Sequence, residues 1–567
     1  MQIWRINVHD QSIKKETPTP AYTQLGGRGL LTQILLDEVL PRCDPLGSHN
    51  KLIFAPGLIS GHMLSSSDRI SIGAKSPLTG GVKEANAGGT TSLKLTFLGI
   101  KALIVEGAPA GDGLWLVHLS QDGARFEAAD DLAGMGVYQT AAMLRQRFGE
   151  EVAISLIGPG GEMGLLSAGI QNLDKEGVPS RICARGGLGA VMGSKGLKAI
   201  VIDASVASKQ PILDLPAYRL AQKDFNQALL GHPQTRVYAD YGTAAMMAVT
   251  NTLGGLPTRN FTQGDFEHFD EINAEQMRLQ ILARNGEGET THACMPGCAV
   301  RCSNVYTDVD GRTIVSPLEY ETIALMGSNL GIGDLEIIAR LNYEANDLGI
   351  DSIEIGAALG IYAQSGRMKF GDGAHALQLL NEIRSNSPLG RVLGNGAALA
   401  GKALGVRRIP VTKGQAMAAY DPRAIKGTGV TYATSPQGAD HTAGLTIRAK
   451  ADHHAPEGQV ALSRNAQINM AGYDTLGVCI FAGFGFGASP PDTIARLLHA
   501  RYGWQVENDI LQALGRKTLS LEREFNRRAG FTSRDDRLPE WMCEEPLPPN
   551  HVVFDVPEQE LDALFDW

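Results

Sequence analysis

Residues 334–351 read DLEIIARLNYEANDLGID, and this stretch predicts a helix that ends in a sharp turn. Asp334 is a typical helix N-cap, and Gly349 is well placed to close the helix in the left-handed conformation. The apolar residues between them share one helical face: Leu335, Ile338, Leu341, Ala345 and Leu348. Asp351 then predicts the start of a second helix, with Glu354 three residues later in a capping-box arrangement.

The end of this stretch is repeated later in the chain. Asn346 to Asp351 (NDLGID) and Asp474 to Cys479 (DTLGVC) share the pattern Asx-x-x-Gly-aliphatic-Asp/Cys, and both are expected at a helix end. A glycine turn flanked by carboxylate and amide acceptors suits a planar, donor-rich heterocycle such as a pterin or a purine. Two unrelated Asx caps beside glycine turns are an equally good explanation.

The first 205 residues or so have a different character. Short β-rich runs separated by Gly- or Pro-bearing turns recur at 51–54, 69–74, 101–106, 114–119, 152–157 and 198–202, with a helical stretch at 136–148. Apolar and polar side chains alternate only imperfectly in residues 114–119, which indicates that some strands are buried on both faces. Helical periodicity takes over after 213, and a joint around Pro410 divides the helical part. We therefore expect an α+β chain with a β-rich domain (1–207) and two mainly α-helical domains (208–410 and 411–567).

Composition excludes several classes of protein. The 567 residues carry 51 basic and 61 acidic side chains, a net charge of −10 without long single-sign runs, which argues against binding nucleic acid or an anionic membrane surface. Residues 1–20 show no secretory signal, and the apolar stretch 476–488 is short and glycine-rich, so we expect a cytoplasmic protein without a membrane span. With 43% apolar residues the chain can bury a large core.

Cysteines indicate a ligated site. Cys294, Cys298 and Cys302 form a C-x3-C-x3-C cluster, and Cys479, at the end of the second turn motif, is the candidate fourth ligand. Four thiolates favour an iron–sulfur cluster or a tetrahedral zinc ion. The C-x2-C pairs usual for zinc are missing, and the spacing is one residue longer than the C-x3-C-x2-C of radical S-adenosylmethionine enzymes. The other three thiols are scattered and are expected to be ordinary.

Three loop segments in the β-rich part, two of them rich in glycine, predict a large anionic cofactor. Residues 184–195 (ARGGLGAVMGSK) match neither a Walker loop nor a dinucleotide fingerprint, but Arg185 could hold a phosphate beside backbone N–H groups. Residues 65–69 and 84–89 have a similar character. One such loop would be weak evidence, whereas three together indicate a glycine-lined binding surface.

Taken in order, these motifs resemble the aldehyde ferredoxin oxidoreductase family. The resemblance covers most of the chain: Arg69, 75–80 (KSPLTG), 86–89 (NAGG), 185–195, 319–322 (EYET), 346–351, 433–441 (ATSPQGADH) and 474–479. It implies a saddle-like β domain that carries tungsten (sometimes molybdenum) on two pterins, two helical domains, a [4Fe-4S] cluster and a bridging Mg²⁺. It also implies electron transfer to ferredoxin or an Fe–S partner subunit.

The resemblance assigns the cofactor ligands residue by residue. The cluster ligands would be Cys294, Cys298, Cys302 and Cys479, although the better-known family spacing, C-x2-C-x3-C, is one residue shorter. Pterin and phosphate contacts would come from Arg69, Asn86, Gly88, Arg185, Gly186, Asn346, Ile350, Asp351, Asp474, Val478 and Ile480. The backbone carbonyls of Asn86 and Gly186 would bind Mg²⁺. Asn346 replaces an acidic residue often found there, so it can accept a pterin N–H only without charge assistance.

Glu321 and His441 match the family's acid–base pair. Oxidation of an aldehyde to an acid adds one oxygen and removes two electrons, with proton transfer. Histidine can hold the carbonyl oxygen or pass a proton, and a carboxylate can activate water. Outside their motifs the two residues would be an ordinary surface acid and a satisfied histidine. His453 and His454 are alternative pocket histidines.

The sequence therefore predicts an aldehyde:ferredoxin oxidoreductase acting on a small carbonyl substrate. Oxidation of a 2-hydroxy acid and reduction of an aryl-CoA ring are alternatives with the same cofactors. A non-catalytic Fe–S electron-transfer subunit and a zinc-stabilised structural protein are further alternatives. A homodimer or hetero-oligomer is plausible, but Arg340 lies near the acidic position of the inter-subunit iron found in some members, so we do not expect that metal.

Overall fold

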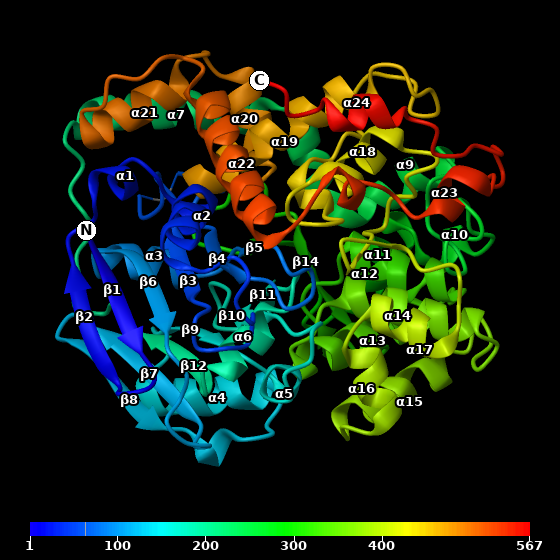
Figure 1. Ribbon diagram of the computed structural model, residues 1–567, viewed down its shortest axis with the longest axis horizontal. Coiled ribbons are helices and arrows are strands. Elements are labelled where there is room, and N and C mark those ends of the chain that lie inside the picture. The colour runs from blue at the N-terminus through cyan, green and yellow to red at the C-terminus, as the bar shows by residue number, and fades with distance from the viewer. Residues whose placement is uncertain (63) are drawn as a thin grey trace.

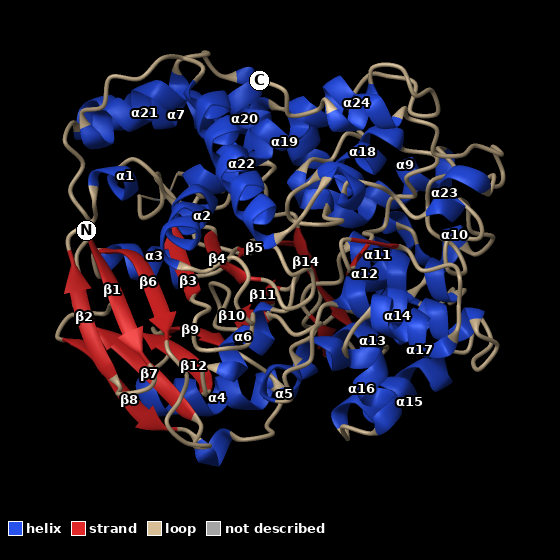
Figure 2. Cartoon of the chain, in the orientation of Figure 1, coloured by secondary structure: helices blue, strands red, loops and turns tan. Residues whose placement is uncertain are grey.

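The computed structural model describes residues 1–62 and 64–567. Strands gather in the N-terminal part of the chain, whereas helices make up nearly all of the rest (Figures 1 and 2). All six β-rich runs expected from the sequence are strands, with bounds shifted by at most two residues, and the expected helix is α4 (Val137–Phe148). The predicted α+β class is confirmed.

Two six-stranded sheets form the β-rich part, and they have the same topology. The first has the order β2-β1-β6-β3-β4-β5 and the second, read from the corresponding edge, β8-β7-β12-β9-β10-β11. In each sheet only one pair of neighbours is parallel, β1 with β6 and β7 with β12. The first sheet consists of β1 (Gln2–Asn7), β2 (Ser12–Glu16), β3 (Leu52–Pro56), β4 (Ile70–Lys75), β5 (Val82–Ala87) and β6 (Ile100–Glu106). The second consists of β7 (Trp115–Ser120), β8 (Gly123–Ala128), β9 (Ala153–Leu156), β10 (Ile170–Asn172), β11 (Arg181–Cys183) and β12 (Leu197–Ile202).

The sheets pack face to face, and their outer faces are covered by helices. One apolar cluster joins residues of both sheets, including Phe54 and Ile72 from the first and Ile200 from the second. Helix α2 (Gly27–Glu38) packs on the outer face of the first sheet, and α4 packs on that of the second. This layering leaves β4 and β12 buried along their whole length, as expected for strands enclosed on both faces.

The helical part forms two groups (Figure 1). Helices α12 (Tyr320–Met326), α13 (Leu335–Leu348), α14 (Ser352–Gln364), α15 (Gly373–Arg384), α16 (Pro388–Gly394) and α17 (Ala397–Leu404) pack together. The second group contains α18 (Lys426–Thr434), α19 (Gln459–Leu476), α20 (Ala482–Ala488), α21 (Thr493–Tyr502) and α22 (Ile510–Ala529). Helix α7 (Leu215–Gly231) packs on α20 and α21 although it lies far from them in sequence. The three domain ranges remain predictions.

The helix caps were predicted well, with one exception. Asp334 caps α13 by accepting the N–H groups of Glu336 and Ile337, and Gly349 closes this helix at φ +71°. Asp351 caps α14, but the expected capping box with Glu354 is wrong. The fully buried Glu354 carboxylate instead accepts the backbone N–H groups of Ala397 and Ala416, which would otherwise lie unpaired in the core.

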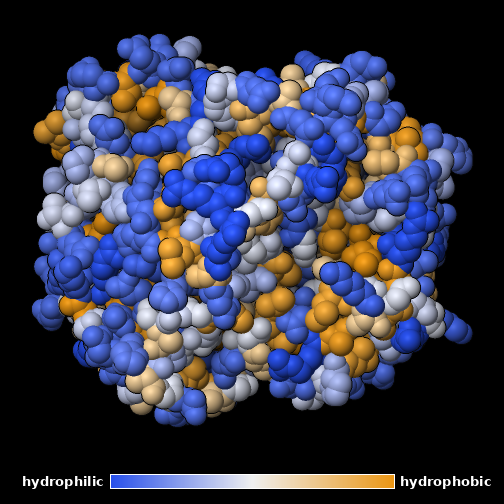
Figure 3. Space-filling model, viewed as in Figure 1, coloured by the Kyte–Doolittle hydropathy of each residue, from blue (hydrophilic) through white to orange (hydrophobic). Residues whose placement is uncertain are grey.

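The molecular surface mixes residue types. On the face viewed in Figure 3, hydrophobic residues form scattered groups between hydrophilic ones. Within residues 1–62 and 64–567, no one helix has both the length and the apolar character to cross a membrane. The bent pair Tyr320–Leu330 and Leu335–Leu348, at 115° to each other, meets these criteria only when taken together.

Candidate active site

A cavity of about 700 Å³ lies between the β-rich part and the helices, and most of the predicted site residues line it. These are Arg69, Asn86, Gly88, Cys294, Cys302, Glu321, Asn346, Asp351, His441, Asp474, Cys479 and Ile480. Arg185, Gly186, Cys298, Ile350 and Val478 are not part of its lining. Residues predicted for the cluster, the heterocycle and the acid–base pair thus meet around one space.

The four candidate cluster cysteines come together from two places. Cys294, Cys298 and Cys302 lie on the loop between β13 (Glu289–His292) and β14 (Ser303–Thr307), and Cys479 follows α19. Ser66 links the two segments, because its carbonyl accepts the Cys479 N–H at 2.8 Å while its Oγ lies 3.6 Å from Cys298 Sγ.

The thiols occupy an environment suited to ligands. A hydrogen bond with Cys294 lowers the pKa of Cys298 to about 6, whereas that bond and burial raise the pKa of Cys294. Gly88 has no room for a side chain, since a Cβ there would lie 2.9 Å from Cys294 Sγ. All seven cysteines are free thiols. A thiolate-binding group is therefore compatible with this donor set.

The two turn motifs attach to the β-rich part in the same way. Gly349 accepts the N–H of Gly169 at 2.9 Å, and Asp351 donates its N–H to Ser167 at 2.8 Å. In the second turn, Gly477 accepts the N–H of Arg69 at 3.1 Å, and Cys479 donates to Ser66. Both glycines have a left-handed backbone and end a helix, α13 and α19, as the sequence predicted.

Asp474 is fixed by a buried polar network. One carboxylate oxygen accepts from Asn86 Nδ2 and the other from Arg28 Nη1, both at 3.1 Å. Arg28 also forms a two-pronged ion pair with Glu522 at 2.7 and 2.8 Å. Burial and the negative charge of Glu84 raise the pKa of Asp474, and Arg28 opposes that rise. Asp474 is thus held between the first sheet and the helices.

Glu321 and His441 face each other in the cavity. Glu321, in the first turn of α12, has one oxygen 3.3 Å from His441 Nε2, and its other oxygen accepts the N–H of Ala419 at 2.8 Å. Burial raises the pKa of Glu321, while the neighbouring His441 opposes this shift. Among the described residues, Glu321 Oε1 and His441 Nδ1 make no hydrogen bond. Their nearest charged neighbours are His441 Nε2, 3.3 Å from Glu321 Oε1, and Asp440 Oδ1, 3.8 Å from His441 Nδ1, so both atoms retain capacity for a hydrogen bond.

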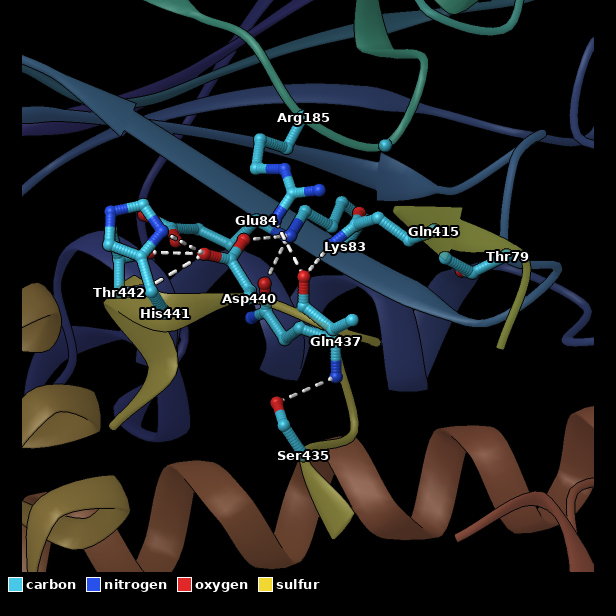
Figure 4. Close-up of polar contacts among 12 residues, drawn as sticks. Thr79, Lys83, Glu84, Arg185, Gln415, Ser435, Gln437, Asp440, His441 and Thr442 are labelled. Carbon is cyan, nitrogen blue, oxygen red and sulfur yellow. Dashed lines mark hydrogen bonds and ion pairs between the residues drawn. The ribbon is translucent and has the colours of Figure 1, made fainter. Parts of the chain in front are cut away.

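Asp440 positions the catalytic candidate His441 (Figure 4). Its carboxylate accepts from the Thr442 N–H at 3.1 Å and hydroxyl at 2.8 Å, and it pairs with Lys83 Nζ at 2.6 Å. The Lys83 and Arg185 charges hold the pKa of Asp440 well below its ordinary value. Arg185 also donates to the Ala439 carbonyl at 2.6 Å, so one buried cation holds the backbone and another the Asp440 side chain just before His441.

Arg185 contacts several protein groups, and its role as a phosphate ligand stays a prediction. Its guanidinium donates to Asp351 at 3.3 Å and to the carbonyls of Ala416 and Ala439. The alternative pocket histidines lie elsewhere: neither His453 nor His454 lines the cavity, and His454 Nε2 lies 2.9 Å from the Leu253 carbonyl oxygen.

Sequence reasoning missed several residues of the site. Lys83, Arg28 and Glu522 support His441 and Asp474 from distant parts of the chain, and Arg181 lines the cavity near the cysteines. Lys83 could have been noticed because it directly precedes the predicted binding segment 84–89. Glu522, in the middle of α22, has no local signal.

Two family models match the chain in order. The model described as "Aldehyde ferredoxin oxidoreductase, N-terminal domain" matches residues 3–204, and the one described as "Aldehyde ferredoxin oxidoreductase, domains 2 & 3" matches residues 221–566. The chain belongs to the aldehyde ferredoxin oxidoreductase family. The predicted resemblance is confirmed, and the chain is an enzyme of the oxidoreductase class.

Individual relatives agree with this assignment. The tungsten-containing aldehyde ferredoxin oxidoreductase of Pyrococcus horikoshii is 33% identical over 97% of this chain and 93% of its own length. The "Aliphatic sulfonate oxidoreductase, WOR-like subunit" of Pyrococcus furiosus is 28% identical over 75% of this chain and 72% of its own length.

A solved structure shares the fold of this aldehyde ferredoxin oxidoreductase family member. It is the active site complex BamBC of benzoyl coenzyme A reductase with 1,5 dienoyl-CoA. It superposes with a TM-score of 0.79 over 95% of this chain and 90% of that chain, at 18% identity. At this identity the likeness concerns the fold alone.

Proposed function

We propose that this chain oxidises an aldehyde, or a related small carbonyl compound, to the acid: RCHO + H₂O → RCOO⁻ + 3 H⁺ + 2 e⁻. Cys294, Cys298, Cys302 and Cys479 would hold a [4Fe-4S] cluster, which would supply one-electron transfer to ferredoxin or an Fe–S partner subunit. The observation that carries this proposal is the Glu321–His441 pair, 3.3 Å apart in the cavity that Cys294, Cys302 and Cys479 also line.

The residues around the cavity fit the tungsten or molybdenum bis-pterin of this family. The volume of about 700 Å³ suits a large cofactor, and Glu321 Oε1 and His441 Nδ1 make no hydrogen bond among the described residues. When bound, this group supplies two-electron acceptance and polarises the carbonyl. The turns at 346–351 and 474–479 would hold the pterins, with Arg69, Asn86 and Gly88 beneath them.

Magnesium would bind the carbonyls of Asn86 and Gly186. Each carbonyl accepts one hydrogen bond from protein, Asn86 from Arg69 Nη2 at 2.9 Å and Gly186 from Ser76 Oγ at 2.7 Å. A carbonyl oxygen has a second lone pair, so each retains an acceptor site, and oxygen ligands suit Mg²⁺.

The chain's own residues then divide the proton chemistry. His441 can hold the carbonyl oxygen through a ring N–H, and Glu321 can accept a proton from the attacking water. The Ala419 N–H orients the Glu321 carboxylate, and the raised pKa of Glu321 makes it a stronger base than an exposed glutamate. Asp440 keeps the His441 turn in place.

Metal analysis and a substrate panel on anaerobically purified protein test this proposal. We expect one tungsten or molybdenum and four irons per chain, with viologen reduction by aldehydes. Iron without tungsten or molybdenum would indicate an electron-transfer subunit, and zinc without visible Fe–S absorbance a structural zinc protein. Either result would contradict the proposal.

Arg448 favours a second candidate, a substrate that carries a negative charge, such as a 2-hydroxy acid or a CoA thioester. Arg448 lines the cavity, and its guanidinium carbon lies 4.4 Å from the ring centre of Tyr238 and 5.3 Å from that of Phe484. No carboxylate among the described residues offsets the effect of its burial, which lowers its pKa to about 10, so it remains charged at neutral pH. Turnover of 2-hydroxy acids or aryl-CoA in place of aldehydes would favour this candidate.

A further inference from the structure

Three metal-ligating side chains meet outside the cavity, where the β-rich part contacts the strand that precedes the cysteine loop. Asp174 and Glu176 lie on the loop between β10 and β11, and His292 ends β13. The ligand atoms of these three residues all lie within 4.8 Å of one another. None of the three has a role in the proposed oxidation.

His292 is arranged as a metal ligand. Its side chain is 6% exposed, and Nδ1 lies 2.8 Å from a carboxylate oxygen of Glu289. A ring N–H directed at this carboxylate leaves the lone pair of Nε2 on the opposite side, as in a carboxylate–histidine–metal arrangement. Nε2 faces Glu176 Oε2 at 3.3 Å and Asp174 Oδ2 at 3.6 Å, yet it makes no hydrogen bond among the described residues.

Asp174 is held rigidly in place. Its Oδ1 accepts the N–H groups of Glu176 at 3.0 Å and Val178 at 2.9 Å, and its Oδ2 accepts the Ser180 hydroxyl at 2.9 Å. Oδ2 therefore faces His292 without rotational freedom and retains a lone pair. Glu176 is 41% exposed, which gives an ion from solvent access to the site.

We infer that His292 Nε2, Asp174 Oδ2 and Glu176 Oε2 bind a divalent transition-metal ion such as Zn²⁺, with Glu289 orienting the histidine. For metal–ligand bonds of about 2.0–2.2 Å, the ligand atoms of a tetrahedral site are about 3.4 Å apart, close to the two distances from Nε2. One neutral imidazole and two carboxylates offset the charge of the ion, while the other oxygen of Glu176 pairs with Lys175, and water completes the coordination.

The position of the ion gives it a structural consequence. The backbone of His292 pairs with Cys302 and Ser303, and His292 lies two residues before Cys294. An ion that joins His292 to Asp174 would tie the loop bearing three of the four candidate cluster ligands to the β-rich part. This consequence, unlike the ion site itself, rests on the proposed function.

Zinc binding to the anaerobically purified holoenzyme tests the site. After equilibration with Zn²⁺ and gel filtration, we expect wild type to retain one zinc per chain more than Glu176→Gln, with tungsten and iron unchanged. Glu176 is partly exposed, so this substitution should fold. Glu457→Gln, at an exposed position before α19, is the matched control and should bind zinc as wild type does. Glu289→Gln should weaken binding by about 10–100-fold.

Equal zinc content in wild type and Glu176→Gln would overturn the inference. If tungsten, four irons and aldehyde activity were present in that case, the proposed function would stand while the zinc site failed. A zinc difference between these variants in a protein without tungsten would support the zinc site and contradict the proposed function.

Discussion

The two turns at 346–351 and 474–479 share a backbone conformation and a hydrogen-bonding pattern but differ in their side chains. Each ends a helix at a left-handed glycine, accepts an N–H at that glycine carbonyl and donates an N–H two residues later. Their partners lie just before β10 and β4, which hold equivalent places in the two sheets. The same backbone arrangement therefore occurs in both turns, and the side chains determine which group each turn can bind.

The side chains give each turn a different task. In the first turn Asp351 pairs with Arg185, which also donates to Ala439, two residues before His441, so this turn supports the proposed acid–base pair. In the second turn the corresponding residue is Cys479, beside the other cysteines. The same backbone arrangement thus supports the proposed acid–base residues in one turn and the predicted cluster in the other.

Replacing Cys479, the predicted cluster ligand in the second turn, should have the largest effect. Cys479→Ser should lose the intact cluster and reduce turnover below detection, because serine is a poor substitute for a thiolate ligand. The adjacent pterin should be perturbed as well. Asp351→Ser is the matched control in the other turn, where serine can still cap α14, and it should keep four irons per chain. An intact, fully occupied cluster in Cys479→Ser would show that another residue is the fourth ligand.

Replacing His441 tests the proposed acid–base chemistry that the first turn supports. His441→Ala should retain tungsten and the cluster, because the histidine is not among their predicted ligands. Turnover should fall by about 10²-fold or more, the usual contribution of general acid–base catalysis. Iron and tungsten content with viologen turnover measures both effects. Unchanged turnover would remove His441 from the mechanism.

The pH profile sharpens the role of Glu321. Burial raises the pKa of this carboxyl above its ordinary value of 4.5, and a general base must be ionised. Activity should therefore fall about tenfold per pH unit below this raised pKa, so the acid limb of kcat/KM should lie above pH 4.5. Glu321→Gln should abolish this acid limb and lower the pH-independent value of kcat/KM. A limb that persists in this variant would belong to another group.

Local patterns predicted the elements of the fold but not its repeat. The run 101–106 was expected as a strand and is β6, because strand propensity and flanking turns are local signals. The equal topology of the two sheets depends on pairing between distant strands, such as β1 with β6, which no periodicity reveals. Propensity also could not place Glu354, whose partners Ala397 and Ala416 lie 43 and 62 residues away.

Candidate site residues that belong to sequence motifs could be named from the sequence. Residues that reach the site only through tertiary contacts could not. Glu321 and His441 are ordinary residues outside their motifs, and the family resemblance singled them out. Arg28 and Glu522 lie 494 residues apart and meet only in the folded chain. Arg185 was expected to hold a phosphate, which stays a prediction, and the partners that the structure gives it, two carbonyls and Asp351, belong to other segments.

The smallest expected effect comes from exchanging the first residues of the two turns. Asp474→Asn loses a carboxylate that accepts from Asn86 and Arg28, and should lower the free energy of unfolding of the holoenzyme by about 1–3 kcal/mol, the value of a buried charged hydrogen bond. Asn346→Asp adds a charge that can strengthen a pterin N–H contact but must be desolvated, so the two contributions should nearly cancel, to within about 1 kcal/mol. Thermal unfolding together with tungsten content measures both. A larger loss of stability in Asn346→Asp than in Asp474→Asn would contradict this expectation. It would indicate that the neutral side chain of Asn346 stabilises the protein through a hydrogen bond that does not depend on the pterin.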